Sequence, residues 1–318
     1  SLTIGTGGSD GGPMLIVGNG VTIAASTTVR LVGTSTLKLG DATWGSGTLQ
    51  LNNANTGAVP LQFGTTTTAF TAATGTVTFT GTGGGIVVAT TTYYNLNLTP
   101  TSTAAAVGSF STYRFNMGGS TCTSGGCTAT TTVSNVLTIN EFAQANFNTI
   151  DVVLSGSGTV LSKSKGTFVA NGAWVLYTAT AATNIATGTY ERFLVRGAAT
   201  KTLLGNTTAT TSVQVDPNAT LAISTYTFTA TGATWLNDGT VTEDTGGKIV
   251  LASATQLDDG SGTAKNSFNG DARDTVSVQL TDTSFNLLAA TIETQTAAIT
   301  AVSGIRDGET VTLTETTA

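Results

Sequence analysis

The residues with the clearest potential for chemistry are four aspartates near the end of the chain, in LDDGSG and KNSFNGDARD. They are Asp258, Asp259, Asp271 and Asp274. Carboxylate oxygens are the ligands that Ca²⁺ prefers, so the cluster is a candidate Ca²⁺ site. A solvated loop is the alternative, because neither EF-hand spacing nor a nonapeptide calcium repeat is present. Calcium is the one cofactor that the sequence suggests.

Cys122 and Cys127, the two cysteines of the chain, lie five positions apart in GGSTCTSGGCTA. A redox pair normally has two intervening residues and begins a helix, and neither feature is present. A metal site would need further ligands, and the chain contains no histidine. We therefore expect a local disulfide in an oxidising compartment, which stabilises the fold by no more than about 2 kcal/mol because its loop is short.

Few other residues suggest catalysis. Without histidine, Ser-His-Asp chemistry is excluded, and the six glutamates are scattered among threonine-rich strands rather than grouped as a glycosidase pair would be. The aromatic residues could form sugar-stacking platforms or belong to the core; they are Trp44, Trp174, Trp235, Tyr93, Tyr94 and Tyr190. We expect the core role, and we expect that the protein is not an enzyme.

Three asparagines begin Asn-x-Thr triplets, namely Asn97, Asn206 and Asn218. In an exported protein such a triplet at the surface accepts N-linked glycans. In a chain so rich in threonine the triplets also arise by chance, so glycosylation and coincidence both stay open.

The composition indicates an exported protein with a packed interior. Charged residues make up 9% of the chain, against about 25% in an ordinary soluble protein. Apolar residues make up 39%, which is too much for a disordered chain of low charge. The sequence has no cluster of Lys or Arg of the kind that binds nucleic acid. No apolar run approaches the roughly 18 residues of a membrane span. A chain that begins with Ser1 fits a mature form after signal-peptide removal or a trimmed chain. We expect an extracellular or cell-surface location.

Short alternating runs closed by Gly or Asn fill the chain, and they predict strands. No helical pattern of ten residues interrupts them. Residues 91–108 match residues 188–205 at a constant offset of 97, including the Tyr, the apolar run and the closing Gly. We therefore predict an all-β fold, either an elongated β-solenoid or tandem β-sandwich repeats. The predicted modules are 1–130, 131–262 and 263–318, with a composition break near 262.

The last 45 residues show longer alternating strands with Leu280–Thr283, Asp307–Gly308 and Leu313–Thr316. These motifs resemble the immunoglobulin-like repeats of prokaryotic surface and S-layer proteins. The resemblance implies a C-terminal immunoglobulin-like sandwich, incomplete on its own because further strands normally follow. Upstream, TYYNLNL and its copy resemble the strand repeats of large bacterial adhesins and haemagglutinin-like exoproteins.

The favoured function is a secreted structural subunit that polymerises head-to-tail into a filament, sheath or pilus-like fibre. The chain begins and ends in strand sequences, with Leu2 and Ile4 in the first and Val311 and Leu313 in the last. Strand edges without partners invite pairing between copies, as in donor-strand complementation. The alternative is an adhesin or S-layer-like protein that binds glycans or a host surface. A polysaccharide lyase would need a cluster of basic and acidic residues that the sequence does not show.

Overall fold

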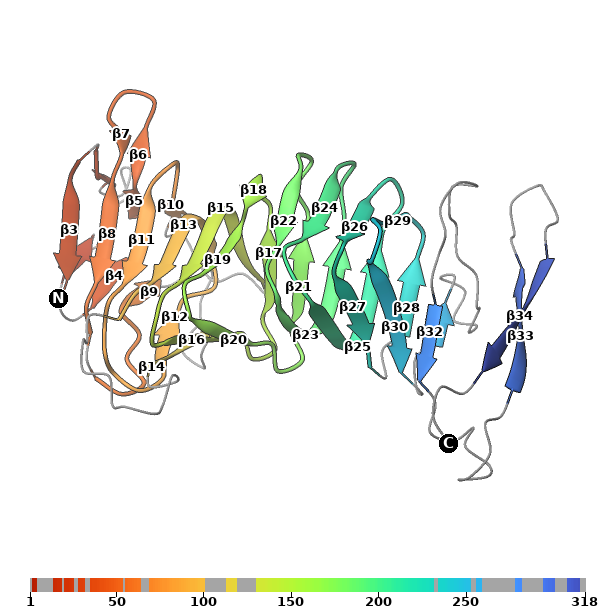
Figure 1. Ribbon diagram of the computed structural model, residues 1–318. Helices are drawn as coiled ribbons and strands as arrows, with labels where there is room; N and C mark the ends of the chain where they lie inside the picture. Colours follow the sequence, from red (N-terminus) through yellow and green to blue (C-terminus); the bar gives the residue numbers. More distant parts are fainter. Residues whose placement is uncertain are drawn as a thin grey trace. The chain divides into compact units, whose positions relative to one another are not determined.

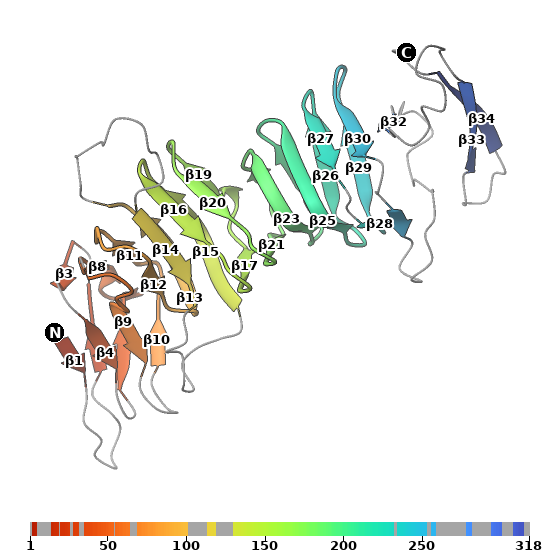
Figure 2. The same ribbon diagram turned by 90° about the horizontal axis from the view of Figure 1, so that it is seen from below.

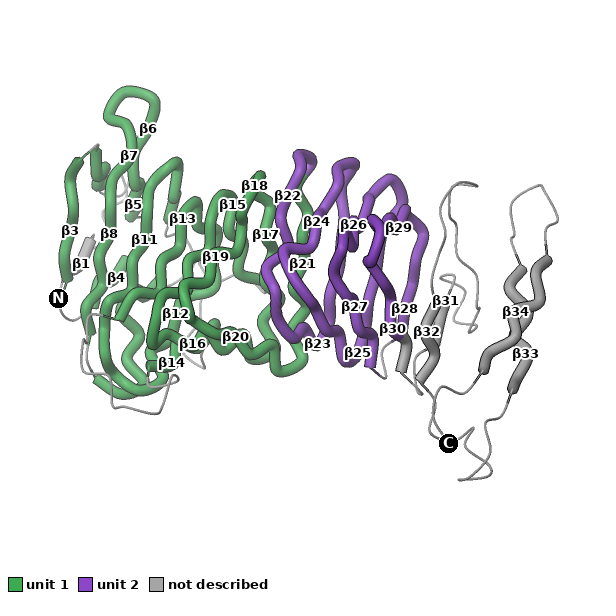
Figure 3. Tube along the Cα trace, in the orientation of Figure 1, with its two compact units in different colours: residues 1–179 green, residues 180–318 purple. Residues whose placement is uncertain are grey.

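Every described element in the computed structural model is a β-strand. The structure describes residues 2–4, 14–18, 20–25, 28–31, 35–53, 55–63, 69–100, 113–118, 130–231, 234–252, 256–258, 278–281, 294–300 and 308–314. Within these ranges it describes side chains from residue 14 to residue 250, apart from residue 69. The chain divides into two compact units, residues 1–179 and 180–318 (Figure 3).

The first unit contains strands β1 to β21. They are β1 (Leu2–Ile4), β2 (Met14–Ile16), β3 (Thr22–Ala25), β4 (Val29–Leu31), β5 (Thr36–Lys38), β6 (Gly40–Asp41), β7 (Gly45–Ser46), β8 (Thr48–Leu51), β9 (Leu61–Phe63), β10 (Ala69–Thr71), β11 (Thr76–Phe79), β12 (Ile86–Val88), β13 (Thr92–Leu98), β14 (Tyr113–Met117), β15 (Thr130–Ile139), β16 (Ala143–Asn146), β17 (Asp151–Leu154), β18 (Gly158–Thr159), β19 (Leu161–Lys163), β20 (Thr167–Val169) and β21 (Trp174–Tyr177).

The second unit contains the remaining strands. They are β22 (Thr183–Ile185), β23 (Gly188–Val195), β24 (Thr200–Leu203), β25 (Thr207–Val215), β26 (Thr220–Ser224), β27 (Thr227–Ala230), β28 (Thr234–Asn237), β29 (Thr240–Glu243), β30 (Lys248–Ala252), β31 (Gln256–Asp258), β32 (Val278–Thr281), β33 (Thr294–Thr300) and β34 (Gly308–Thr314).

Strands of successive coils pair in parallel, which makes each unit a β-solenoid (Figures 1 and 2). In the first unit the longest sheet runs β3-β8-β11-β13-β15-β17-β21, and a second runs β12-β14-β16-β20. In the second unit the corresponding sheets run β23-β25-β27-β30-β32 and β22-β24-β26-β29. The stacked coils make about nine turns in all. The predicted all-β fold is confirmed, and of the two architectures considered the solenoid is the one observed.

Long strands turn from one face of the coil to the next. In β25, residues 207–209 pair with β27, whereas residues 212–215 pair with β28. In β15, residues 130–133 pair with β17, whereas residues 137–139 pair with β19. Each of these strands therefore covers two faces of its coil.

The repeat at an offset of 97 residues corresponds to a repeated structural corner. Tyr93 in β13 and Tyr190 in β23 are both fully buried, and the pairing register shifts directly after each. The Tyr93 hydroxyl donates to the Ala89 carbonyl at 2.7 Å, and the Tyr190 hydroxyl donates to the Ala186 carbonyl at 2.6 Å. The repeat therefore preserves a buried tyrosine that ties a strand back to the residue four positions before it.

We expect Tyr93→Phe to lower the free energy of unfolding by about 1 kcal/mol, because the Ala89 carbonyl loses its hydroxyl donor. Tyr190→Phe should have the same effect on the second unit. Urea unfolding measures both changes. Tyr94→Phe is the control, since Tyr94 is half-buried at the next position of the same strand. Equal effects of Tyr93→Phe and Tyr94→Phe would show that the Tyr93 hydroxyl contributes no stability.

Inward-facing residues alternate with outward-facing ones and build an apolar interior in each unit. In the second unit this interior contains an aromatic series in which neighbouring ring centroids lie 5.1 to 5.7 Å apart. Its members are Tyr190, Phe193, Phe228 and Trp235. Rings at such separations and tilts add stability beyond the area that they bury.

The predicted modules 1–130, 131–262 and 263–318 stay predictions, and the compact units of the structure are residues 1–179 and 180–318. The boundary predicted after residue 130 falls at the first residue of β15, and the one predicted after 262 lies outside the described residues. In the range 263–318, β32 pairs in parallel with β30, and β33 and β34 form an antiparallel pair. The immunoglobulin-like sandwich stays a prediction, because most of this range lies outside the described residues.

Candidate functional site

Most residues that the sequence suggested for metal or disulfide chemistry lie outside the described part of the chain. Cys122, Cys127, Asp259, Asp271 and Asp274 all do. Asp258 ends β31, where its backbone pairs with Leu236, but its side chain is not described. Among the described residues, no group of three or more His, Cys, Asp or Glu could hold a metal ion. The Ca²⁺ site and the disulfide stay predictions.

The three candidate glycosylation sites occupy different environments. Asn97 lies in β13 and is half-buried, whereas Asn206 and Asn218 are exposed. The Asn206 side-chain oxygen accepts a hydrogen bond from the Thr227 backbone N–H at 2.9 Å. Asn218 has a φ of 66°, a conformation that asparagine tolerates in turns. Asn206 and Asn218 are thus more accessible than Asn97, and glycosylation stays a prediction.

The aromatic residues divide between the core and the surface. Tyr93, Tyr190 and Trp235 are buried, as the core role requires, and Tyr94 and Trp174 are half-buried. Trp44 is different, because 62% of it is exposed. Of the six aromatic residues, only Trp44 presents a largely exposed ring.

Trp44 lies in a short hairpin, β6/β7, that projects beyond the N-terminal end of β8 (Figure 1). The Asp41 carboxylate accepts hydrogen bonds from the backbone N–H groups of Thr43 at 2.8 Å and Trp44 at 2.7 Å. Gly40 has a φ of 108°, and a Cβ at that position would lie 1.9 Å from the Gly45 carbonyl oxygen. These contacts hold the hairpin backbone in place beneath the exposed indole.

The longest sheet of the first unit presents two outward columns of side chains, which we call the ladder face. The first column is Thr22, Thr48, Thr76 and Asn95, and the second is Ala24, Gln50, Thr78, Asn97 and Thr138. All nine are exposed or half-buried. The five strands that carry them, β3, β8, β11, β13 and β15, contain no charged residue. The ladder face is therefore uncharged, and eight of its nine side chains carry a hydroxyl or amide group.

Side-chain amides connect neighbouring coils at this face. The Asn95 amide donates to the Thr76 hydroxyl at 3.2 Å, and the Asn135 amide donates to the Asn95 side-chain oxygen at 2.8 Å. Each donor lies one coil after its acceptor. Asparagine has two N–H donors and two acceptor lone pairs, so these two bonds use only part of the capacity of Asn95. The side chain is oriented and keeps hydrogen-bonding capacity toward the solvent.

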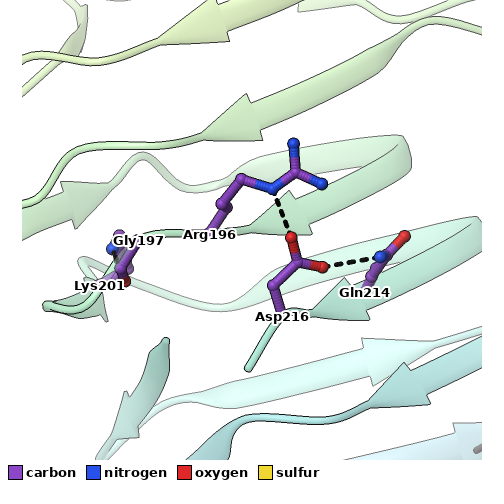
Figure 4. Close-up of polar contacts among 5 residues, drawn as sticks. All are labelled: Arg196, Gly197, Lys201, Gln214 and Asp216. Carbon is purple, nitrogen blue, oxygen red and sulfur yellow. Dashed lines mark hydrogen bonds and ion pairs between the residues drawn. The ribbon is translucent and has the colours of Figure 1, made fainter. Parts of the chain in front are cut away.

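The second unit contains a buried lysine that the sequence analysis did not single out. Lys201 in β24 has no exposed surface, and its ammonium group donates to the Gly197 carbonyl at 2.7 Å (Figure 4) and to the Ala199 carbonyl at 3.0 Å. Burial lowers the pKa of Lys201 to about 8. Two carbonyls of one short loop hold the group, so its evident role is to fix that loop against β24.

A second polar group lies at the ends of β23 and β25. The Asp216 carboxylate accepts a hydrogen bond from the Gln214 amide at 2.7 Å and forms an ion pair with Arg196 (Figure 4). Asp216 is buried and Arg196 is largely exposed. Asp216 also starts a turn in which the Ala219 N–H donates to the Asp216 carbonyl at 3.1 Å. These contacts join two successive coils.

Parallel coils, inward apolar residues and side-chain ladders together define the protein as a β-solenoid. No protein-family model matches the chain, and no curated protein or solved structure matches it. Among the described residues, no helix is long and apolar enough to cross a membrane.

Proposed function

We propose that the protein is an extracellular structural subunit that assembles head-to-tail into a filament, sheath or pilus-like fibre. The observation that carries the proposal is the edge of β3, the first strand of the longest sheet of the first unit. Within the described part of the chain, β3 pairs only with β8. In this proposal a strand of another copy pairs with the other edge of β3.

The hydrogen bonds between β3 and β8 show which residues of β3 direct their backbone groups toward the other edge. The Thr48 N–H donates to the Val21 carbonyl at 3.0 Å, and the Asn52 N–H donates to the Ala25 carbonyl at 2.8 Å. In a parallel strand, residues alternate in the neighbour to which their backbone groups point. Thr22 and Ala24 therefore direct their N–H and C=O groups away from β8. β3 carries no Lys or Pro, the residues that commonly protect an edge.

The hairpin β33/β34 is a candidate for the surface of one copy that contacts β3 of the next copy. It has two strands, and within the described residues neither pairs with a further strand. A two-stranded hairpin alone is marginally stable, so a strand from another copy would stabilise it. Val311 and Leu313 lie in β34, and Leu2 and Ile4 lie in β1, which pairs only with β4 among the described strands. A contact between such different surfaces is heterologous and propagates if the rotation does not close.

Ala24→Pro tests the proposal. It removes an outward N–H that β8 does not use, at an exposed residue of an edge strand, where proline is tolerated. We expect fibres of the original protein in negative-stain micrographs and dispersed particles of the variant. Ala24→Thr keeps the N–H and is the matched control. Ala24→Lys, which places a charge at the edge, covers the case in which the proline variant fails to fold. Fibres from both Ala24→Pro and Ala24→Lys would contradict assembly through β3.

A cell-surface adhesin is the second candidate function. The observation that favours it is the exposed indole of Trp44 on a hairpin whose backbone is held by Asp41. Tryptophan combines a large apolar ring with a polar N–H group, and it is enriched at interfaces for that reason. Binding of glycans by dispersed protein would support this function.

A further inference from the structure

We propose that the ladder face, together with Trp44, binds a neutral, linear β-1,4-linked polysaccharide. This inference rests on the second candidate function and names the site for it. Of the nine ladder side chains, eight carry a hydroxyl or amide group and one is alanine, and their strands contain no charged residue. Such a face cannot form ion pairs with an anionic or cationic ligand, but it can exchange hydrogen bonds with sugar hydroxyls.

The strand spacing of the ladder face suits an extended sugar chain. Neighbouring strands of a sheet lie about 4.7–4.9 Å apart, and outward residues of one strand repeat about every 6.6–6.8 Å. The strand spacing is close to the length of one pyranose unit in an extended β-1,4-linked chain. A polysaccharide that runs across β3, β8, β11, β13 and β15 therefore meets one new coil with each sugar. The second column alone offers hydrogen-bonding groups on four successive strands, from Gln50 to Thr138.

Part of the ladder face is preorganised. The bonds from Asn135 to Asn95 and from Asn95 to Thr76 orient these side chains before any ligand arrives. A side chain that is already ordered loses less conformational entropy on binding. Amides and hydroxyls both donate and accept hydrogen bonds, as sugar hydroxyls do.

Trp44 supplies an apolar contact at the end of the ladder face where β3 and β8 begin. A Cβ on Gly18, which precedes β3, would lie 3.2 Å from the Trp44 carbonyl oxygen and 3.3 Å from its Cβ. Trp44 is thus anchored beside the loop into β3, while its ring is exposed. An exposed indole can stack on the apolar face of a pyranose ring.

The test is depletion of the protein by insoluble microcrystalline cellulose, chitin and mannan, separated by low-speed sedimentation, with protein alone as the blank. We expect binding to at least one of the three. Thr48→Val and Thr78→Val each replace a ladder hydroxyl by a methyl group and should weaken binding about fivefold. Trp44→Ala should weaken it about fivefold to tenfold. Thr202→Val and Thr220→Val are the controls, because these half-buried threonines lie outward on β24 and β26 of the second unit.

Several outcomes would overturn the proposal. Binding to none of the three polysaccharides would do so, and so would equal binding by the ladder and control variants. Loss on Trp44→Ala alone would assign glycan binding to the hairpin and not to the ladder, leaving the adhesin function standing. Negative-stain micrographs of the same variants separate this proposal from assembly. If Thr48→Val and Thr78→Val abolish fibres, the ladder face is a contact between copies and not a polysaccharide site.

Discussion

Gly75→Ala should lower the free energy of unfolding by about 3 kcal/mol, because an alanine Cβ does not fit between two successive coils. At Gly75, a Cβ would lie 2.4 Å from both the carbonyl oxygen and the Cβ of Leu39, and 2.8 Å from the Gly47 carbonyl oxygen. Two of these three atoms belong to backbone, which cannot move aside as the end of a flexible side chain can. The coils must separate locally to admit the methyl group.

That separation would strain the hydrogen bonds next to Gly75. The Thr76 N–H donates to the Gly47 carbonyl at 3.0 Å, and the Asn95 N–H donates to the Gly75 carbonyl at 3.2 Å. Gly75 therefore lies within a continuous series that links three coils. Glycine is needed here because of the close approach, and not because of an unusual backbone angle.

Gly84→Ala is the matched control, since a Cβ at Gly84 would lie no closer than 3.7 Å to Thr56. That distance is an ordinary contact, so we expect a change of less than about 1 kcal/mol for the control. Urea unfolding of the two variants measures the difference. Similar stabilities for Gly75→Ala and Gly84→Ala would show that the coils relax easily at this corner.

The sequence was sufficient to predict the all-β fold. Apolar and polar residues alternate along a solenoid strand because one face of the strand points into the core and the other points to the solvent. In β11, Val77 and Phe79 point inward while Thr76 and Thr78 point outward. The copy at an offset of 97 residues was also informative. It maps Tyr93 onto Tyr190, and both have the same buried hydrogen bond.

The ladder face could not be predicted from the sequence, because coils differ in length. Asn95 aligns with Thr76, 19 residues earlier, but its donor Asn135 comes 40 residues later. No single offset brings the two columns together. The sequence also did not indicate that Trp44 is exposed, because a single tryptophan among strands can belong to the core or to the surface.

Lys201 could have been found. In the strand TKTL, Lys201 lies two residues before Leu203 and therefore on the same face of the strand, and Leu203 is buried. Lys201 also pairs with Thr183 of β22 and Leu221 of β26 in the neighbouring coils, and both of these residues are buried. A lysine at an inward position is expected to donate hydrogen bonds to nearby carbonyl oxygens. Here the acceptors are the carbonyls of Gly197 and Ala199.

Lys201 should contribute a rise in stability of about 2 kcal/mol between pH 8 and pH 10, and Lys201→Met should remove that contribution. Burial lowers the pKa of Lys201 to about 8 in the folded protein, whereas an exposed lysine has a pKa of about 10.4. Between these values the unfolded chain binds a proton that the folded chain has released. Stability therefore rises with pH through this window, and below pH 8 the cost of the buried charge is fully present.

Urea unfolding at pH 7, 8, 9 and 10 measures the effect, and Lys165→Met is the control. Lys165 is exposed and pairs with Glu141 at 2.9 Å, so its removal should leave the rise intact. Burial also lowers the pKa of Lys163, so a smaller rise should remain in Lys201→Met. An undiminished rise would assign the titration to another group. Above pH 10 the direction reverses, because burial holds the pKa of Tyr93 far above its usual value. The unfolded chain then loses tyrosine protons that the folded chain retains, so stability should be highest near pH 10.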